Sequence, residues 1–186
     1  MASHREAIQG VLHKEDGTLA VTDAHRLYVA YNTPGVRENA VKSVSGKVLD
    51  VVFPEVSRLI PDLDSATKTA QIIVKEFHHA VDHIYSVAKL VSNPPILGIS
   101  LNKVSYTGSN TKDLMDTSLT AQYSVQLEIG DNELHVNAKY MLDALKMFKS
   151  EKEDEVTLYF FGKVRPFVLV NRSRDLLALI LPVRKF

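Results

Sequence analysis

The sequence contains no cysteine, and this absence excludes several kinds of chemistry. Disulfides, zinc sites built on thiolates and cysteine nucleophiles all need a side chain that is not there. The residues after Met1 lack the apolar core of a signal peptide, and no apolar run is long enough to span a bilayer. The lack of cysteine suits the reducing cytoplasm, and with no signal peptide or membrane span in view the sequence predicts a cytoplasmic location.

An excess of charge of either sign is also missing, because the chain has 22 lysine and arginine residues and 22 aspartate and glutamate residues. Such a chain has no long-range field that would draw it onto nucleic acid or an anionic membrane, so any DNA contact must come from local patches. The eight glycines are scattered and form no phosphate-binding loop. What the sequence does have is 45% hydrophobic residues in 186, enough for the core of one domain or one and a half small ones.

The N-terminal part has the pattern of short strands. Asp16-Gly17 lies between two apolar segments and predicts a hairpin. Further strand is expected at 27–31 and, interrupted by Gly46, within 41–52. The polar segment 61–69 has no periodicity, and we expect the boundary between a small N-terminal and a larger C-terminal portion there.

Two segments have helical periodicity. From Val74 to Val91, apolar residues recur at steps of three and four until Asn93-Pro94-Pro95 ends the pattern. A second helix is marked by Met141, Leu145 and their apolar neighbours, with Asn137 as its expected N-cap.

Strand-like runs follow each helix. They lie at 96–101, 103–107 and 118–129 after the first, and at 156–161, 167–170 and 176–181 after the second. A unit of strand, helix and several strands thus occurs twice, at a spacing of roughly sixty residues. The sequence predicts an α+β protein with antiparallel sheets, two main helices and an internal duplication.

Four short motifs are more specific than this pattern. They are Val21-Thr22-Asp23-Ala24-His25-Arg26-Leu27, Phe53-Pro54-Glu55-Val56-Ser57-Arg58-Leu59-Ile60-Pro61, the segment 136–145 and Leu179-Ile180-Leu181-Pro182-Val183-Arg184. In this order they resemble motifs of the bacterial DNA polymerase III beta subunit, or sliding clamp, family. Their counterparts are the Ala-Thr-Asp-Gly-His-Arg-Leu motif of the middle domain, the linker to the last domain, the start of the last helix and the C-terminal signature.

The chain departs from the family pattern at several positions. Ala24 stands where the family usually has glycine, Leu181 and Val183 stand where methionine is common, and Lys185-Phe186 is additional. The stretch between Tyr31 and Phe53 is shorter than the family requires, so we expect the helix that normally lies there to be absent.

The resemblance implies a DNA-clamp fold and a division of the chain. Residues 1–61 would be a mainly β remnant of the middle domain with the linker, and residues 62–186 a complete C-terminal domain. The family's first domain and the front half of its second find no match, which would fit either a fragment or a natural short clamp. Because the family ring closes between a first and a last domain, we expect monomers or weak self-association rather than a ring.

The resemblance also implies a function without chemistry or cofactor, that of a DNA polymerase processivity factor. Its partners would be DNA polymerase, other clamp-binding proteins and the clamp loader, with double-stranded DNA contacted without sequence specificity. The implied peptide-binding cleft comprises Thr22, His25, Arg26, Leu27, Pro54, Arg58, Leu59, Asn137, Tyr140, Val164, Pro166, Leu179, Ile180, Leu181, Pro182, Val183 and Arg184. The residues expected to contact DNA phosphates are Lys75, Lys89, Lys139, Lys146 and Lys149.

Two alternative sites remain open at this point. His25 beside Asp23 is a pairing used in hydrolases, although a hydrogen-bonded structural pair is the commoner arrangement. His79 and His83 lie one helical turn apart, a spacing that can bind a metal, although a solvated helix face has the same pattern. The alternative function is therefore a small hydrolase or a metal-binding protein.

Overall fold

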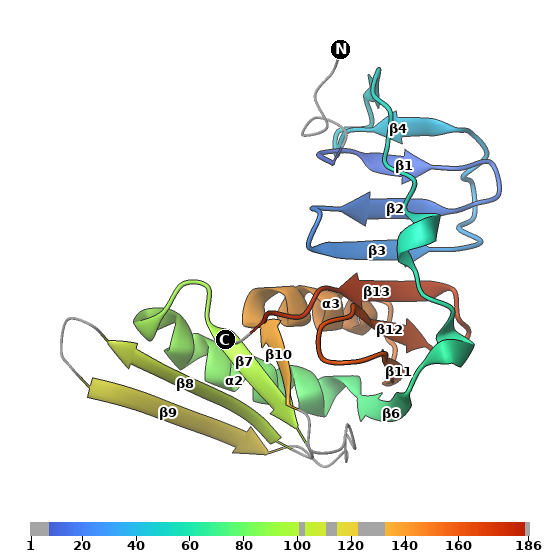
Figure 1. Ribbon diagram of the computed structural model, residues 1–186. Helices are drawn as coiled ribbons and strands as arrows, with labels where there is room; N and C mark the ends of the chain where they lie inside the picture. Colours follow the sequence, from blue (N-terminus) through green and yellow to red (C-terminus); the bar gives the residue numbers. More distant parts are fainter. Residues whose placement is uncertain (1–7, 101–102, 111–114, 123–132, 185–186) are drawn as a thin grey trace.

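The structure, a computed structural model, describes residues 8–100, 103–110, 115–122 and 133–184. Figure 1 shows an N-terminal layer of strands standing on a larger body that contains the helices α2 and α3. The N-terminal strands are β1 (Val11–His13), β2 (Leu19–Thr22), β3 (Arg26–Ala30), β4 (Ala40–Lys42) and β5 (Val48–Leu49). The linker carries two short 3-10 helices, η1 (Ser57–Leu59) and η2 (Leu63–Ser65).

The larger body contains the strand-helix-strands unit twice, as the sequence predicts. The first unit is β6 (Lys68–Ile73), α2 (Val74–Val91), β7 (Ile96–Ser100), β8 (Lys103–Asn110) and β9 (Met115–Gln122). The second is β10 (Leu134–Asn137), α3 (Ala138–Ser150), β11 (Glu155–Phe160), β12 (Phe167–Asn171) and β13 (Leu176–Ile180). The predicted strand 118–129 continues into residues 123–132, which lie outside the described residues, as do Lys185 and Phe186.

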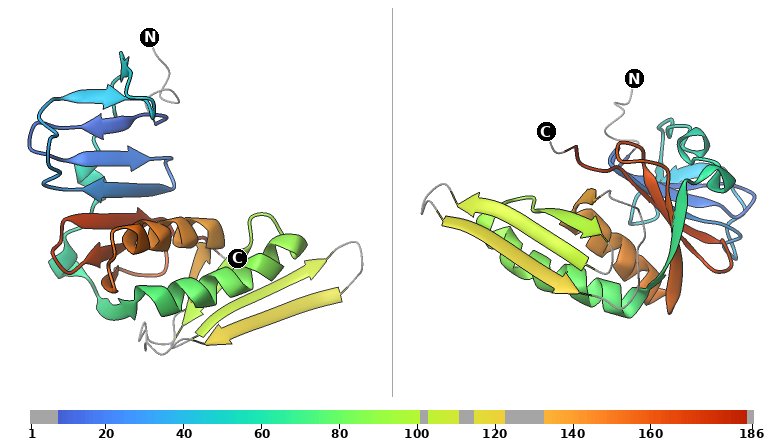
Figure 2. Two further views of the ribbon diagram at one scale, coloured as in Figure 1. Left: turned by 180° about the vertical axis from the view of Figure 1, so that it is seen from behind. Right: turned by 60° about the horizontal axis from the view of Figure 1, so that its bottom comes forward.

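All described strands belong to two antiparallel sheets. One has nine strands in the order β5-β4-β1-β2-β3-β13-β12-β11-β6, and the other has four in the order β10-β7-β8-β9. The nine-stranded sheet crosses the boundary expected within 61–69, because β3 pairs with β13 from Leu176↔Ala30 to Ile180↔Arg26. Backbone hydrogen bonding therefore joins the N-terminal strands to the larger body (Figure 2).

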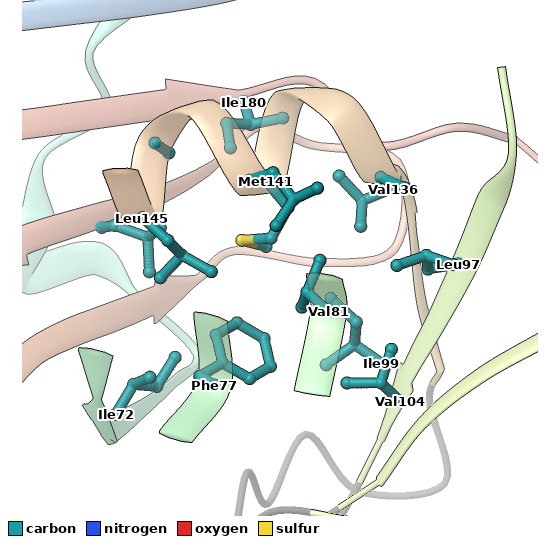
Figure 3. Close-up of a cluster of buried hydrophobic side chains, with 14 of the residues drawn as sticks. Ile72, Phe77, Val81, Leu97, Ile99, Val104, Val136, Met141, Leu145 and Ile180 are labelled. Atoms are coloured by element: carbon teal, nitrogen blue, oxygen red, sulfur yellow. The ribbon is translucent and has the colours of Figure 1, made fainter. Parts of the chain in front are cut away.

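The main core lies around α2 and α3, which pack against one another and against both sheets (Figure 3). Met141, Leu145 and Phe148 of α3 are fully buried, as the helical pattern predicts. They meet Phe77 and Val81 of α2 in the same cluster. The predicted N-cap is confirmed, since the Asn137 side chain accepts a hydrogen bond from the Lys139 amide at 3.0 Å.

Between β3 and the linker every residue is described, and the chain forms only the hairpin β4–β5 there. The expected absence of a helix from this stretch is confirmed. The interruption expected at Gly46 within 41–52 is confirmed, because Gly46, at φ +84°, lies in the turn between the short strands β4 and β5.

The linker packs on the outer face of the nine-stranded sheet, the face turned away from α2 and α3. Val56 shares a small core there with Leu27, Val168 and Leu179, and Ile60 packs against it. This second core holds the linker against both parts of the chain.

Candidate functional site

The predicted cleft motifs meet at one end of three neighbouring strands. The pairs Phe167↔Ile180 and Ile180↔Arg26 align the start of β12, the end of β13 and the start of β3. Just beyond the last pair, the Leu181 amide donates to the carbonyl of His25 at 3.0 Å. Motifs that are far apart in the sequence are therefore side by side here.

The turn before β3 is shaped by its own side chains. The Asp23 carboxylate accepts hydrogen bonds from the amides of His25 and Arg26, at 3.0 and 3.1 Å. Thr22 Oγ1 accepts from the Ala24 amide and donates to the Arg26 carbonyl. Ala24 has φ +72°, a left-handed conformation that glycine adopts without strain, which gives a physical reason for the family's usual glycine.

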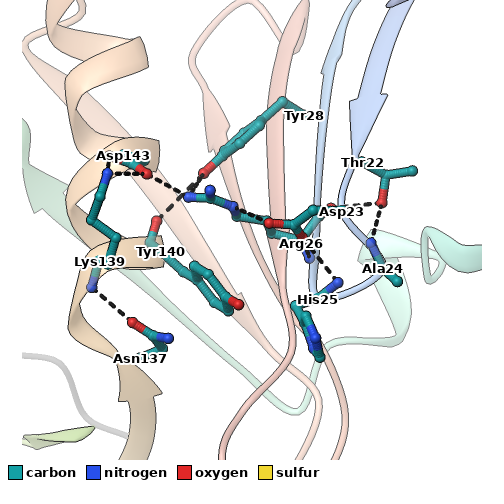
Figure 4. Close-up of polar contacts among 10 residues, drawn as sticks. All are labelled: Thr22, Asp23, Ala24, His25, Arg26, Tyr28, Asn137, Lys139, Tyr140 and Asp143. Atoms are coloured by element: carbon teal, nitrogen blue, oxygen red, sulfur yellow. Dashed lines mark hydrogen bonds and ion pairs between the residues drawn. The ribbon is translucent and has the colours of Figure 1, made fainter. Parts of the chain in front are cut away.

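Arg26 connects this turn to α3 (Figure 4). Its Nε lies 2.9 Å from Asp23 Oδ2, and its guanidinium lies 2.6 Å from Asp143 Oδ2. The guanidinium carbon also lies 4.6 Å from the centre of the Tyr140 ring, a cation–π distance. One half-buried cation thus fixes a loop of the N-terminal part against a helix of the larger body.

The partners of Arg26 are electrostatically coupled. Burial by itself would raise the pKa of Asp143, but hydrogen bonds from Lys139 and Arg26 hold it below its usual value of 3.8. Burial is the largest single effect on Arg26 and would lower its pKa, but the hydrogen bonds to Asp143 and Asp23 and the charge interactions with Tyr28 and Asp23 together outweigh it and raise the pKa. Burial raises the pKa of Tyr28 to about 12, against the opposing effect of Arg26. Asp143 is therefore an anion at neutral pH.

Tyr140 lies in the first turn of α3 and is only partly buried. Its ring stacks on His25, with 5.9 Å between ring centroids and 19° between planes. Together with Arg26, these rings form a partly exposed aromatic surface beside the end of β13 (Figure 4). The neighbouring Asn137 is buried, and its side-chain oxygen is occupied by the helix-capping hydrogen bond.

The apolar residues predicted for the cleft fall into two groups. Leu59, Val164 and Leu181 are exposed by 54%, 60% and 37%, which is unusual for side chains of this kind. Leu27 and Leu179, by contrast, are exposed by only 1% and 4%. Ile180 is buried as well. The side chains of the first group are accessible from solvent, whereas Leu27 and Leu179 belong to the small core under the linker and Ile180 to the helical core on the other face of the sheet.

The remaining predicted cleft residues lie on segments next to this strand end. Pro54 and Arg58 belong to the linker, and Pro166 directly precedes β12. Pro182, Val183 and Arg184 continue from β13, and the Val183 amide donates to the His135 carbonyl at 2.8 Å. A hollow of about 180 Å³ is lined by Val21, Thr22, Asp23, Arg26 and Tyr28, on β2, β3 and the turn between them.

Sequence reasoning missed Asp143 and Tyr28 as members of this cluster. The spacing of Lys139 and Asp143 indicates a helical ion pair, which is present at 2.5 Å. The contact between Arg26 and Asp143 joins residues 117 positions apart and leaves no local signal.

The lysines expected to contact DNA lie on both helices. Lys75, Lys89, Lys146 and Lys149 are exposed, and Lys89 lies over the Tyr85 ring at 5.5 Å. Lys139 differs from them, because its ammonium is paired with Asp143. Lys149 and Lys146 lie close enough to α2 to lower the pKa of His78, after the larger effect of burial.

The geometry favours neither alternative site. The Asp23 carboxylate bonds to backbone amides and to Arg26, while the His25 ring stacks on Tyr140. The rings of His79 and His83 are tilted, with centroids 6.2 Å apart. Among the described residues, no group of three or more histidine, aspartate or glutamate side chains is arranged to hold a metal ion. Across that same part of the chain, no helix combines the length and apolarity needed to cross a membrane.

Comparison with known proteins identifies the family. Residues 57–184 match the family model described as the DNA polymerase III beta subunit, C-terminal domain. The beta sliding clamp of Staphylococcus aureus is 33% identical over 147 residues, 75% of this chain and 36% of that protein. That of Staphylococcus epidermidis is 28% identical over 161 residues, 86% of this chain and 41% of that protein.

Solved structures give the same fold. The Caulobacter crescentus beta sliding clamp has a TM-score of 0.76 at 17% identity, over all of this chain and 60% of the other. The beta chain of DNA polymerase III from Streptococcus pneumoniae has a TM-score of 0.75 at 20% identity, over 97% of this chain and 58% of the other. The predicted DNA-clamp fold is confirmed.

The chain spans about two fifths of the length of the curated relatives it matches. Since the family model covers residues 57–184, well over half of the chain, this chain belongs to the DNA polymerase III beta subunit family.

Proposed function

We propose that this chain is a non-enzymatic docking module of the sliding-clamp type, which holds short peptide tails of replication and repair proteins. The observation that carries the proposal is the meeting of Leu181, His25 and Tyr140 at one strand end. Each comes from a different motif of the resemblance, and Leu181 and His25 are exposed.

The chemistry of the strand end suits a short peptide with apolar anchors. Burying a leucine or phenylalanine side chain contributes about 1.5–3 kcal/mol each. Two such anchors on Leu181, Val164 and Tyr140, with a few backbone hydrogen bonds, give about micromolar affinity after the entropy of association is subtracted. Arg184 and Arg58 are exposed and supply polar groups that orient the peptide.

The wider role follows from the family. DNA polymerase, other clamp-binding proteins and the clamp loader are the proposed partners, and the proposed effect is processivity of the polymerase. Lys75, Lys89, Lys146 and Lys149 would contact DNA phosphates without reading sequence, a salt-dependent interaction. The division into a middle-domain remnant, 1–61, and a C-terminal domain, 62–186, belongs to the same proposal, as does a cytoplasmic location.

Peptide titration tests the docking function. A fluorescent peptide with a glutamine, a leucine and a terminal Leu-Phe pair should bind at low micromolar Kd by fluorescence anisotropy. The matched control is the same peptide with both apolar anchors replaced by alanine. The docking function is refuted if the first peptide shows no binding at about 100 μM, well above the expected range.

A further inference from the structure

A polar groove of about 670 Å³ lies on the outer face of the nine-stranded sheet and shares no residue with the candidate cleft. Val156, Leu158 and Phe160 of β11 point into the helical core, so the alternate residues Thr157 and Tyr159 point outward. The groove floor is formed by these two with Thr69 and Gln71 of β6, and its rim by Arg172 and Arg174.

The rim is held in shape by a buried amide. The two N–H groups of Asn171 Nδ2 are shared among Glu153 Oε1, Ser173 Oγ and Asp175 Oδ1, which lie at 2.7, 2.9 and 2.6 Å. Its Oδ1 accepts from the Leu176 amide at 3.0 Å. The turn between β12 and β13 is therefore fixed by internal hydrogen bonds before any ligand arrives.

The same hydrogen-bond network engages the acidic residue of the turn and, among the described residues, leaves its two arginines unpaired. Hydrogen bonds from Asn171 and Ser173 hold the pKa of Asp175 below its usual value, so this carboxylate is an anion engaged within the turn. Arg172 and Arg174 are exposed at the rim, and no ion pair within the described part of the chain involves them. Two guanidiniums on a fixed turn are a donor set suited to phosphate, which they can bind bidentately.

The groove changes in chemistry along its length. The register Val156↔Asn171 puts Glu155 next to the arginine rim, and Tyr159↔Val168 puts the tyrosine further along. From Glu155 to Tyr159 is four residues, about 13 Å at the rise of a strand. Between them, the side chains of Gln71 and Thr157 are hydrogen bonded at 3.0 Å. A carboxylate so near the rim disfavours a ligand that is anionic along its whole length, such as an acidic peptide.

We propose that this groove binds a nucleoside diphosphate. The phosphates lie on Arg172 and Arg174, the ribose hydroxyls donate to the Glu155 carboxylate, and the base packs on the partly buried Tyr159 ring. The order of anion, hydroxyls and aromatic base matches the order of side chains along the groove. A volume of about 670 Å³ falls in the range of small-molecule sites.

Calorimetric titration with ADP, inorganic pyrophosphate and adenosine tests the proposal. ADP should bind at least tenfold more tightly than either part alone. The double variant Arg172→Gln/Arg174→Gln should weaken ADP at least tenfold and leave adenosine unchanged. Arg37→Ala, at an exposed arginine of the β3–β4 connection, is the matched control and should bind ADP normally.

A second comparison tests the position of the ribose. The unsubstituted protein should prefer ADP to 2′,3′-dideoxy-ADP, and Glu155→Gln should reduce this preference. Pyrophosphate binding as tightly as ADP would mean an anion patch only and would overturn the proposal. Competition in which hexaglutamate displaces bound ADP at a lower concentration than ADP itself does would overturn it as well. Normal ADP affinity in the folded Arg172→Gln/Arg174→Gln variant would have the same consequence. These measurements do not involve the peptide cleft, so the result is independent of the proposed docking function.

Discussion

The N-terminal strands and the larger body use the same kind of sheet but cover it differently. The order β4-β1-β2-β3 parallels β10-β7-β8-β9, with β4 in the place of β10. β10 leads directly into α3, whereas β4 leads into β5 and the linker. The four-stranded sheet has α2 and α3 packed on one face, whereas the N-terminal strands of the nine-stranded sheet leave Val11, Leu19 and Val21 partly exposed around a shallow hollow.

The difference shows how a layer without its own helices is stabilised. The apolar face of a sheet must pack against another element, and on one face of the N-terminal strands that element is the linker. Its other supports are the β3–β13 pairing and the contacts of Arg26 with α3. We infer that its stability depends on the larger body.

The largest expected effect comes from the helical core. Leu145→Ala should lower the free energy of unfolding by about 2–5 kcal/mol, because it leaves a cavity among fully buried side chains. Val21→Ala on the partly exposed N-terminal face should cost less than about 1.5 kcal/mol. Urea unfolding of both variants checks the contrast. Equal losses would show that the N-terminal face is as well covered as the core.

A smaller loss is expected from the link between the two parts. Arg26→Ala removes the ion-pair partner of Asp23 and one of the two ion-pair partners of Asp143, and should cost about 1–3 kcal/mol. Proteolysis should then cut the N-terminal strands before the larger body. Arg37→Ala, at an exposed arginine, is the control; uniform protection in both variants would contradict the proposed dependence.

Acid should weaken the same link. The folded-state pKa of Asp143 is depressed, so its stabilising contribution is complete above the unfolded value near pH 4 and is lost as pH falls through the folded pKa. Asp143→Asn should therefore lower Tm at pH 7 and make little difference once pH is below the folded pKa. Thermal unfolding from pH 7 to pH 2.5 measures this. A Tm difference independent of pH would exclude Asp143 as the titrating group.

Tyr140 tests whether the meeting of the two parts is a binding surface. Because its ring is partly exposed beside His25, Tyr140→Ala should weaken peptide binding at least tenfold, about 1.4 kcal/mol, with a much smaller loss of stability than Leu145→Ala. Anisotropy titration and thermal unfolding of both variants decide whether Tyr140 is a binding residue or a core residue. Tyr140 would be a core residue if its variant unfolded as readily as Leu145→Ala or kept full affinity.

The smallest effect is expected at Ala24. Its φ of +72° is strained for alanine, so Ala24→Gly should relieve the turn, partly offset by the greater entropy of the unfolded chain. We expect a gain below about 1 kcal/mol in urea unfolding. Glycine at the remote turn residue Lys152, which has φ +61°, is the matched comparison. A loss of stability in Ala24→Gly alone would mean that the alanine methyl group is needed in the cleft.

The sequence by itself determined the local elements and the family. The three- and four-residue steps of α2 and α3, the Asn137 cap and the repeated strand-helix-strands unit depend on neighbouring residues, which the sequence displays. Tertiary structure decided which distant segments pair, form ion pairs and cover one another. The pairing of β3 with β13, the ion pair of Arg26 with Asp143 and the burial of Leu27 and Leu179 in one core with Val56 of the linker join distant segments. Alternation along a strand tells which residues share a face, but not which partner covers that face, because the cover comes from elsewhere in the chain.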